Sequence, residues 1–267
     1  MTMAPYVPPP SEAPRKTVVA LQWLDPLRWL AMGLNDIRAH PWIGVFYGLA
    51  FWTMALVLGA VFKSNPEYTM SIASGCLLVG PFLAMGLYDV SRRKAAGLNA
   101  DFSASLICWD QHIPSMGMLV LVLIVLELLW GRASLVVFAV FFNTGMPSTA
   151  SVVSAVFNPE NWEFLVAYMV VGGAFAAIVF SLSVVAIPMI LDRDVDAISA
   201  AIASLEVVFH NTGIMVLWGF LLSLLVTVAF LVPWGVGIVV VGPLLGHASW
   251  HAYKSAIQWP EFSGDTP

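Results

Sequence analysis

Six apolar stretches, each long enough to cross a lipid bilayer, fill most of this 267-residue chain. They run over Trp42–Phe62, Tyr68–Val90, Ser115–Phe142, Trp162–Leu191, Gly213–Leu231 and Pro233–Tyr253. About 20 helical residues, rising about 1.5 Å each, cross a hydrocarbon core about 30 Å thick. The third and fourth stretches are longer, so they must tilt, break near the outer surface or project beyond it. We therefore expect six membrane-spanning helices, with Gly131 beside Arg132 as a candidate break in the third.

The composition agrees with a membrane protein. Hydrophobic residues make up 60% of the chain and charged residues 10%, whereas about a quarter of residues are charged in soluble domains. The longest basic run, Arg92-Arg93-Lys94, is typical of residues that flank a span and does not suit a nucleic-acid surface. We expect an all-α polytopic membrane protein whose partners are the lipid bilayer and another membrane protein or complex, and not nucleic acid.

The positive charges predict the orientation of the chain. Of the 11 Lys and Arg residues, all but Lys63 and Arg132 would lie on one side of the membrane. By the positive-inside rule that side is the cytoplasm, so both termini are cytoplasmic. Residues 1–22 then form a mobile cytosolic arm, residues 23–257 a six-helix membrane domain and residues 258–267 a cytosolic tail.

The six spans come as three hairpins with the same lead-in. Before each hairpin, an amphipathic segment starts at an aspartate, carries apolar residues at helical spacing and ends in a histidine. The second span of each hairpin contains a proline, and a polar residue follows that proline by eight positions. The members of the pattern are Asp25, Asp101 and Asp194; His40, His112 and His210; Pro81, Pro188 and Pro243; and Asp89, Asp196 and His251. We expect a pseudo-threefold repeat of units 25–94, 101–191 and 194–257, each an interfacial helix followed by two spans.

All five histidines fall at or near the predicted cytosolic interface. His247 and His251 stand four residues apart on the last span, so both rings lie on one helical face, as a haem iron or another metal would need. A threefold repeat would also bring His40, His112 and His210 towards a common ring. Alternatively, histidine simply suits an interface, because its body is apolar and its tip is polar. We expect no cofactor, with a haem or metal site as the alternative.

Glu127 is an acid deep inside an apolar run. Exposing a charged side chain to lipid costs about 3 kcal/mol, so ionisable residues inside a membrane are candidates for function. Arg132 lies five residues further on, and it could form an ion pair with Glu127 if Gly131 bends the helix. The two readings are a structural ion pair near the outer interface, which we favour, and a proton or ion site.

Short motifs make the chain from Asp25 to Ala256 resemble a known family. The motifs are Leu34-Asn35-Asp36, the stretch Pro41–Gly48, the stretch Gly80–Tyr88 leading to Ser91-Arg92-Arg93, and Gly242-Pro243-Leu244-Leu245-Gly246. The chain resembles DUF2189, a family of bacterial integral membrane proteins of unknown function, some members of which are labelled cytochrome c oxidase subunits. The resemblance implies a bacterial inner (plasma) membrane location and an association with respiratory complexes. It implies no active-site residue.

The sequence contains no phosphate-binding loop, nucleophile motif or zinc-protease motif, so we expect no catalytic residues. The favoured hypothesis is a non-catalytic accessory or assembly protein of a membrane complex, such as a respiratory oxidase. Its interfacial helices and arm would be the contact surface. The alternatives are a small-solute or ion transporter or channel with Glu127 on its pathway, and a haem- or metal-binding membrane protein.

Overall fold

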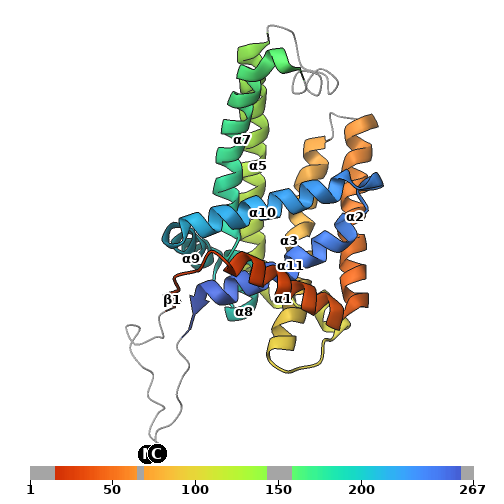
Figure 1. The fold of residues 1–267 in the computed structure, drawn as a ribbon, viewed down its shortest axis with the longest axis vertical. Helices are drawn as coiled ribbons and strands as arrows, with labels where there is room; N and C mark the ends of the chain where they lie inside the picture. The colour runs from red at the N-terminus through yellow and green to blue at the C-terminus, as the bar shows by residue number, and fades with distance from the viewer. Residues whose placement is uncertain (1–15, 65–68, 143–157, 260–267) are drawn as a thin grey trace, which may run out of the picture.

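The computed structural model of the chain describes residues 16–64, 69–142 and 158–259, which are mostly helical (Figure 1). The helices are α1 (Asp25–Ala39), α2 (Pro41–Ser64), α3 (Thr69–Ala95), α4 (Phe102–Ile107), α5 (Ile113–Phe141), α7 (Trp162–Ser183), α8 (Ala186–Arg193), α9 (Ala197–His210), α10 (Thr212–Leu231) and α11 (Ile238–Ala256). Three short 3₁₀ turns are η3 (Asp110–His112), η4 (Pro159–Asn161) and η5 (Pro233–Gly235). Among the described residues, five helical stretches are long and apolar enough to cross a membrane: Pro41–Ser64, Ile72–Ala95, Phe102–Phe141, Trp162–Arg193 and Thr212–Leu231.

Two hairpins dominate the shape of the molecule. Helices α2 and α3 form one, and α5 and α7 form the other, which reaches further along the long axis (Figure 1). Where α3 ends and α5 begins, the bundle also carries α1, α4 and α9, and we call this end the network side. We call the opposite end, where α5 ends and α7 begins, the tip side. The third apolar run was expected to tilt, to break or to project beyond the membrane. A break at Gly131 is wrong, because α5 continues through that residue to Phe141.

The fourth apolar run breaks instead, between α7 and α8. Pro188 has no N–H to donate to the carbonyl of Val184, so the helical hydrogen-bond ladder is interrupted at that point. The N–H of Val185 donates to the hydroxyl of Ser204 on α9, at 3.1 Å. The proline and a side chain from the next helix therefore place a kink near the network side. Pro81 and Pro243, in contrast, lie within continuous helices.

The third hairpin does not repeat the first two. Helices α10 and α11 run across the other hairpins in Figure 1. Near the start of α11, the backbone of Val239 packs directly on Gly48, which is about 10 Å along α2 from Pro41. Helix α11 therefore begins well inside the bundle, and it is not among the five helices that could cross a membrane. The predicted sixth span and the threefold repeat are not confirmed.

Helix α1 lies on α11 and closes the network side. A Cβ atom at Gly33 would lie 2.9 Å from the backbone nitrogen of Ala248, so the missing side chain allows the two helices to touch. Beside this contact, Trp29 is buried and packs in a T-shaped arrangement with Trp218, at a centroid distance of 5.4 Å. The indole N–H of Trp29 donates to the hydroxyl of Ser255 at 3.1 Å. Close approach of backbones at small residues is the usual way in which membrane helices pack.

The chain ends next to the bundle are more ordered than expected. A two-residue strand β1 (Thr17–Val18) pairs antiparallel with β2 (Ile257–Gln258). The side-chain amide of Asn211 binds the segment between β1 and α1. It accepts a hydrogen bond from the N–H of Leu21 and donates one to the carbonyl of Val19. Residues 17–21 of the predicted arm, residues 1–22, therefore lie against the bundle. Residues 1–15 and 260–267 lie outside the described residues.

The aspartates at the starts of the interfacial helices act differently from one another. Asp101 caps α4 by accepting from the N–H of Ala104, as predicted. The cap of α9 is Asp196 and not Asp194, because Asp194 adopts a left-handed backbone conformation with φ of 49° at the end of α8. Asp25 lies inside the first turn of α1, where it pairs with Arg28 at 2.9 Å.

Candidate functional site

The three junction histidines, His40, His112 and His210, do not form the common ring that a threefold repeat would give. His247 and His251 lie on one face of α11 and both point at Asp36 of α1. His112 instead pairs with Asp194, its Nδ1 lying 3.0 Å from a carboxylate oxygen. In the described part of the chain, His40 and His210 end α1 and α9 without joining either contact. The spacing of His247 and His251 thus predicted their common helical face, whereas the structure does not bring the three junction histidines together.

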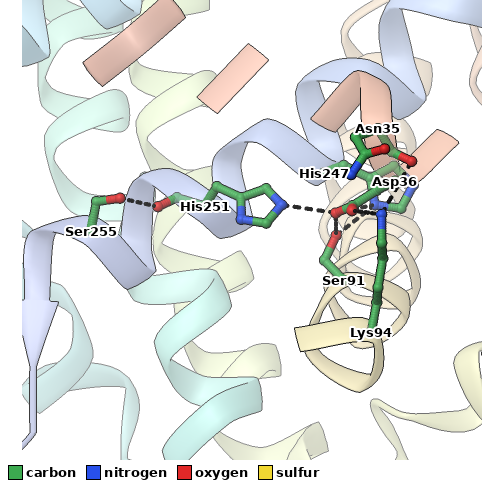
Figure 2. A network of polar contacts seen from close by, with 7 residues as sticks. All are labelled: Asn35, Asp36, Ser91, Lys94, His247, His251 and Ser255. Atoms are coloured by element: carbon green, nitrogen blue, oxygen red, sulfur yellow. Dashed lines mark hydrogen bonds and ion pairs between the residues drawn. The ribbon is translucent and has the colours of Figure 1, made fainter. Parts of the chain in front are cut away.

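Asp36 is the centre of a buried polar network (Figure 2). Its side chain is 5% exposed, and its carboxylate accepts three hydrogen bonds: from the hydroxyl of Ser91 at 2.6 Å, from Nζ of Lys94 at 2.8 Å and from Nε2 of His251 at 2.8 Å. Ser91 and Lys94 lie at the end of α3 and His251 lies on α11, so the network joins three helices. One carboxylate therefore holds the network side together.

The hydrogen bonds fix the tautomer of His247. Nδ1 of its ring lies 2.7 Å from the hydroxyl oxygen of Ser91. A hydroxyl has one proton to donate, and Ser91 donates it to Asp36. Nδ1 of His247 must therefore carry a hydrogen and donate it to Ser91.

Burial and hydrogen bonding set the charges in the network. Burial by itself raises the pKa of Asp36, but the hydrogen bonds from His251, Lys94 and Ser91 outweigh burial and hold that pKa well below its usual range. Burial lowers the pKa of His247 to about 4, although the nearby Asp36 carboxylate opposes this change. His247 is then neutral at pH 7, so its 3.9 Å separation from Asp36 is not an ion pair.

The network can organise charge and protons, but it is closed to a substrate. Ser91 and His247 form a hydroxyl–imidazole pair like that of a nucleophile and its base. Both residues are only 1% exposed, however, so no substrate can reach the hydroxyl group. The exposed atoms of the network belong mainly to Lys94, whose side chain is 30% exposed. The geometry therefore favours a structural or charge-sensing role over catalysis.

A second buried aspartate organises the neighbouring basic residues. Asp89 is fully buried, and its carboxylate pairs with Arg92 at 2.5 Å and with Arg93 at 2.8 Å. Arg92 also donates to the carbonyl of Leu191 at the end of α8, at 3.2 Å. From the sequence this basic run was predicted to flank a span, and its pairing with Asp89 was not predicted. The i, i+3 and i, i+4 spacing from Asp89 was the available signal.

Glu127 does not pair with Arg132. Its Oε2 atom accepts from the hydroxyl of Ser74 on α3 at 2.8 Å. Its Oε1 atom is buried and has no hydrogen-bond partner among the described residues. Residues five apart on an unbroken helix point in different directions, and α5 is unbroken at Gly131, so the predicted ion pair cannot close.

The placement of the His, Cys, Asp and Glu side chains bears on the alternative of a haem or metal site. The described residues contain no group of three or more His, Cys, Asp or Glu side chains placed to hold a metal ion. In the Asp36 network, Lys94 already places a positive charge on the carboxylate that would have to bind the metal. A haem or metal site stays a prediction from the sequence.

Comparison with known proteins finds one family model that part of the chain resembles. Residues 69–192 match the family model described as a predicted integral membrane protein, DUF2189. The resemblance predicted from the sequence is confirmed over this stretch, which contains Ser91, Lys94 and Glu127 but neither Asp36 nor the histidines of α11. No curated protein and no solved structure matched the chain.

Proposed function

We propose that this chain is a non-catalytic accessory protein that docks on another membrane complex. The observation that carries the proposal is the apolar tip of the α5–α7 hairpin. Helix α5 has 29 residues and begins directly after the interfacial segment that contains α4 and η3. At about 1.5 Å per residue it is about 43 Å long, against a hydrocarbon core of about 30 Å.

Tilting does not absorb the excess length. To fit 43 Å into 30 Å, α5 would have to tilt by about 45°, beyond the range of about 0–40° seen for membrane helices. Arg132 lies 19 residues after Ile113, about 28 Å along α5, which is where a positive charge would meet the far boundary. About 13 Å of α5 then extends past the hydrocarbon core.

The part that projects has its own aromatic core and is apolar outside. Phe138 and Phe164 are buried at the tip and form a separate aromatic cluster with Phe142 and Tyr168. On its surface, Val136, Val140 and Trp162 are 64%, 73% and 62% exposed. An apolar surface outside the hydrocarbon core is a typical protein–protein contact. A tip held in shape by its own aromatic core would bind a partner with little loss of conformational freedom.

Further elements of the proposal come from the sequence. We place the protein in a bacterial inner membrane with the network side in the cytoplasm, because the basic residues cluster on that side. The tip then faces the outer side of the membrane. A respiratory oxidase is the complex that the family resemblance suggests. The alternative role in transport stays a prediction that rests on Glu127.

Co-purification after mild solubilisation tests the proposal. The double variant Val136→Asn, Val140→Asn should lose a partner that the wild-type protein retains, while its thermal unfolding midpoint stays the same. The matched control changes two exposed isoleucines of α9, Ile198→Asn and Ile202→Asn, and should keep the partner. Equal recovery of the partner with both variants, or recovery of the wild-type protein alone or as a dimer of itself, would contradict the proposal.

A further inference from the structure

A cavity of about 290 Å³ lies between α3, α5 and α7. Its wall is apolar apart from Glu127, and the aromatic rings of Trp130 and Phe175 contribute to it. Glu127 lies 14 residues after Ile113, about 21 Å along α5, so the cavity is at the depth of the hydrocarbon core. The site is therefore separate from the polar network and from the tip.

The carboxyl group of Glu127 is only half satisfied. The hydroxyl of Ser74 donates a hydrogen bond to Oε2, but Oε1 is buried and has no hydrogen-bond partner in the described part of the chain. Leaving a buried polar atom unpaired is unfavourable, and more so for a charged group. A ligand that brings a hydrogen-bond donor to Oε1 would recover this energy.

The wall of the cavity indicates which kind of donor fits. Aromatic rings attract cations through their negative faces, and a carboxylate attracts them directly. Trp130 is held in place at the cavity by contacts with Tyr168 and Phe175, at centroid distances of 5.1 and 5.9 Å. The ring also lies against Gly172 of α7, where a Cβ atom would be 3.0 Å from it.

We propose that this cavity binds a lipophilic ammonium ion, with its charged nitrogen at Glu127 and its apolar part against the remaining wall. A carboxylate, two aromatic side chains and an otherwise apolar lining match the chemistry of an alkylammonium ion. The ligand would enter from the membrane, because the site lies at the depth of the lipid chains. Such a site is independent of the accessory role proposed above.

The probe is octylammonium, compared with 1-octanol, which has the same chain length and a neutral hydrogen-bonding group. Binding to the protein in lipid nanodiscs is followed by the thermal unfolding midpoint and by one-to-one adducts in native mass spectrometry. Octylammonium should raise the midpoint of the wild-type protein in a saturable manner, and 1-octanol should not. Glu127→Gln should weaken octylammonium binding by about tenfold or more, since a truncated charge pair commonly costs several kcal/mol.

The control variant is Glu163→Gln, which makes the same chemical change at an exposed acid of α7 outside the cavity. It should bind octylammonium like the wild-type protein. Trp130→Leu keeps the carboxyl group and should weaken binding by a smaller factor. Equal effects of octylammonium and 1-octanol, unchanged binding by Glu127→Gln, or no binding by the wild-type protein would overturn the proposal.

Discussion

Replacing Asp36 by asparagine should destabilise the protein more than any other single change of charge in the network. The side chains are nearly equal in size, so packing on α1 is retained while the negative charge is lost. The amide group of asparagine then presents hydrogens to neighbours that are themselves donors, among them Lys94 and His251.

The structure sets the size of the effect. A hydrogen bond to a charged group contributes about 1.5–3 kcal/mol, and Asp36 accepts such bonds from Ser91 and His251 inside the bundle. The bond from Lys94 counts for less, about 1 kcal/mol or below, because the lysine can turn to water. Breaking a buried charged pair costs about 3–5 kcal/mol in other proteins. We expect Asp36→Asn to lower the free energy of unfolding by about 3–4 kcal/mol.

The assay is thermal unfolding in mild detergent, followed by the amount of folded protein on size exclusion. For a chain of this length, about 2–4 °C of midpoint is lost per kcal/mol, so Asp36→Asn should lower the midpoint by about 10 °C. The matched control is Asp194→Asn, which also removes an aspartate bound to a histidine. The side chain of Asp194 is 79% exposed, so the control should lower the midpoint by no more than about 3 °C. Equal shifts for the two variants would refute the argument from burial.

Three further predictions concern packing, pH and capping. Gly48→Ala should destabilise the protein by about 2 kcal/mol or more, because the new methyl group would overlap the backbone of α11. The control is Gly59→Ala on the same helix, whose methyl group would have no atom within 4 Å. In the same thermal assay this control should stabilise the protein by about 0.5–1 kcal/mol. Because the pKa of His247 is lowered to about 4 from 6.5, the unfolded state binds more protons, so the unfolding midpoint should fall as the pH drops from about 6.5 to about 4. The lowered pKa of Asp36 extends this loss below about pH 4, and His247→Asn should flatten the upper part of the profile. Asp196→Ala should remove the cap of α9 and cost about 1 kcal/mol by chemical denaturation.

Local patterns in the sequence predicted local structure well. Long apolar runs correctly predicted five helical stretches that are long and apolar enough to cross a membrane, those that contain α2, α3, α5, α7 and α10, because length and hydropathy are properties of one segment. The histidines of α11 were predicted to share a helical face because their spacing of four residues is likewise a property of one segment. Their common partner on α1 was missed, since Asp36 is more than 200 residues away in the sequence and nothing local links the two segments.

Errors arose where a segment's role depends on its neighbours. Helix α11 has the proline and the length of a span, but contact with Gly48 and with α1 sets where it begins and how it runs. Glu127 was assigned to Arg132, its nearest charge in the sequence, although α5 does not bend and α3 offers Ser74. For Glu127 the deciding contact comes from another helix, so spacing within one segment could not reveal it, whereas the composition of α11 already separates it from the five helices that could cross a membrane.

The two ends of the molecule are stabilised by different interactions, and this bears on function. Between membrane helices the hydrophobic effect supplies little, because lipid chains are as apolar as leucine, so hydrogen bonds and close packing must give the specificity. The network side uses charged hydrogen bonds around Asp36 and Asp89, which tie α1, α3, α8 and α11 into one unit. The tip side uses the aromatic cluster at Phe138 and Phe164, within a single hairpin. Loss of the tip cluster should therefore leave the network side folded. Loss of the network should instead destabilise the helices against which the α5–α7 hairpin packs. This division between a network that joins several helices and a tip with its own aromatic core agrees with the docking role proposed above, and the variants at Val136 and Val140 test that role directly.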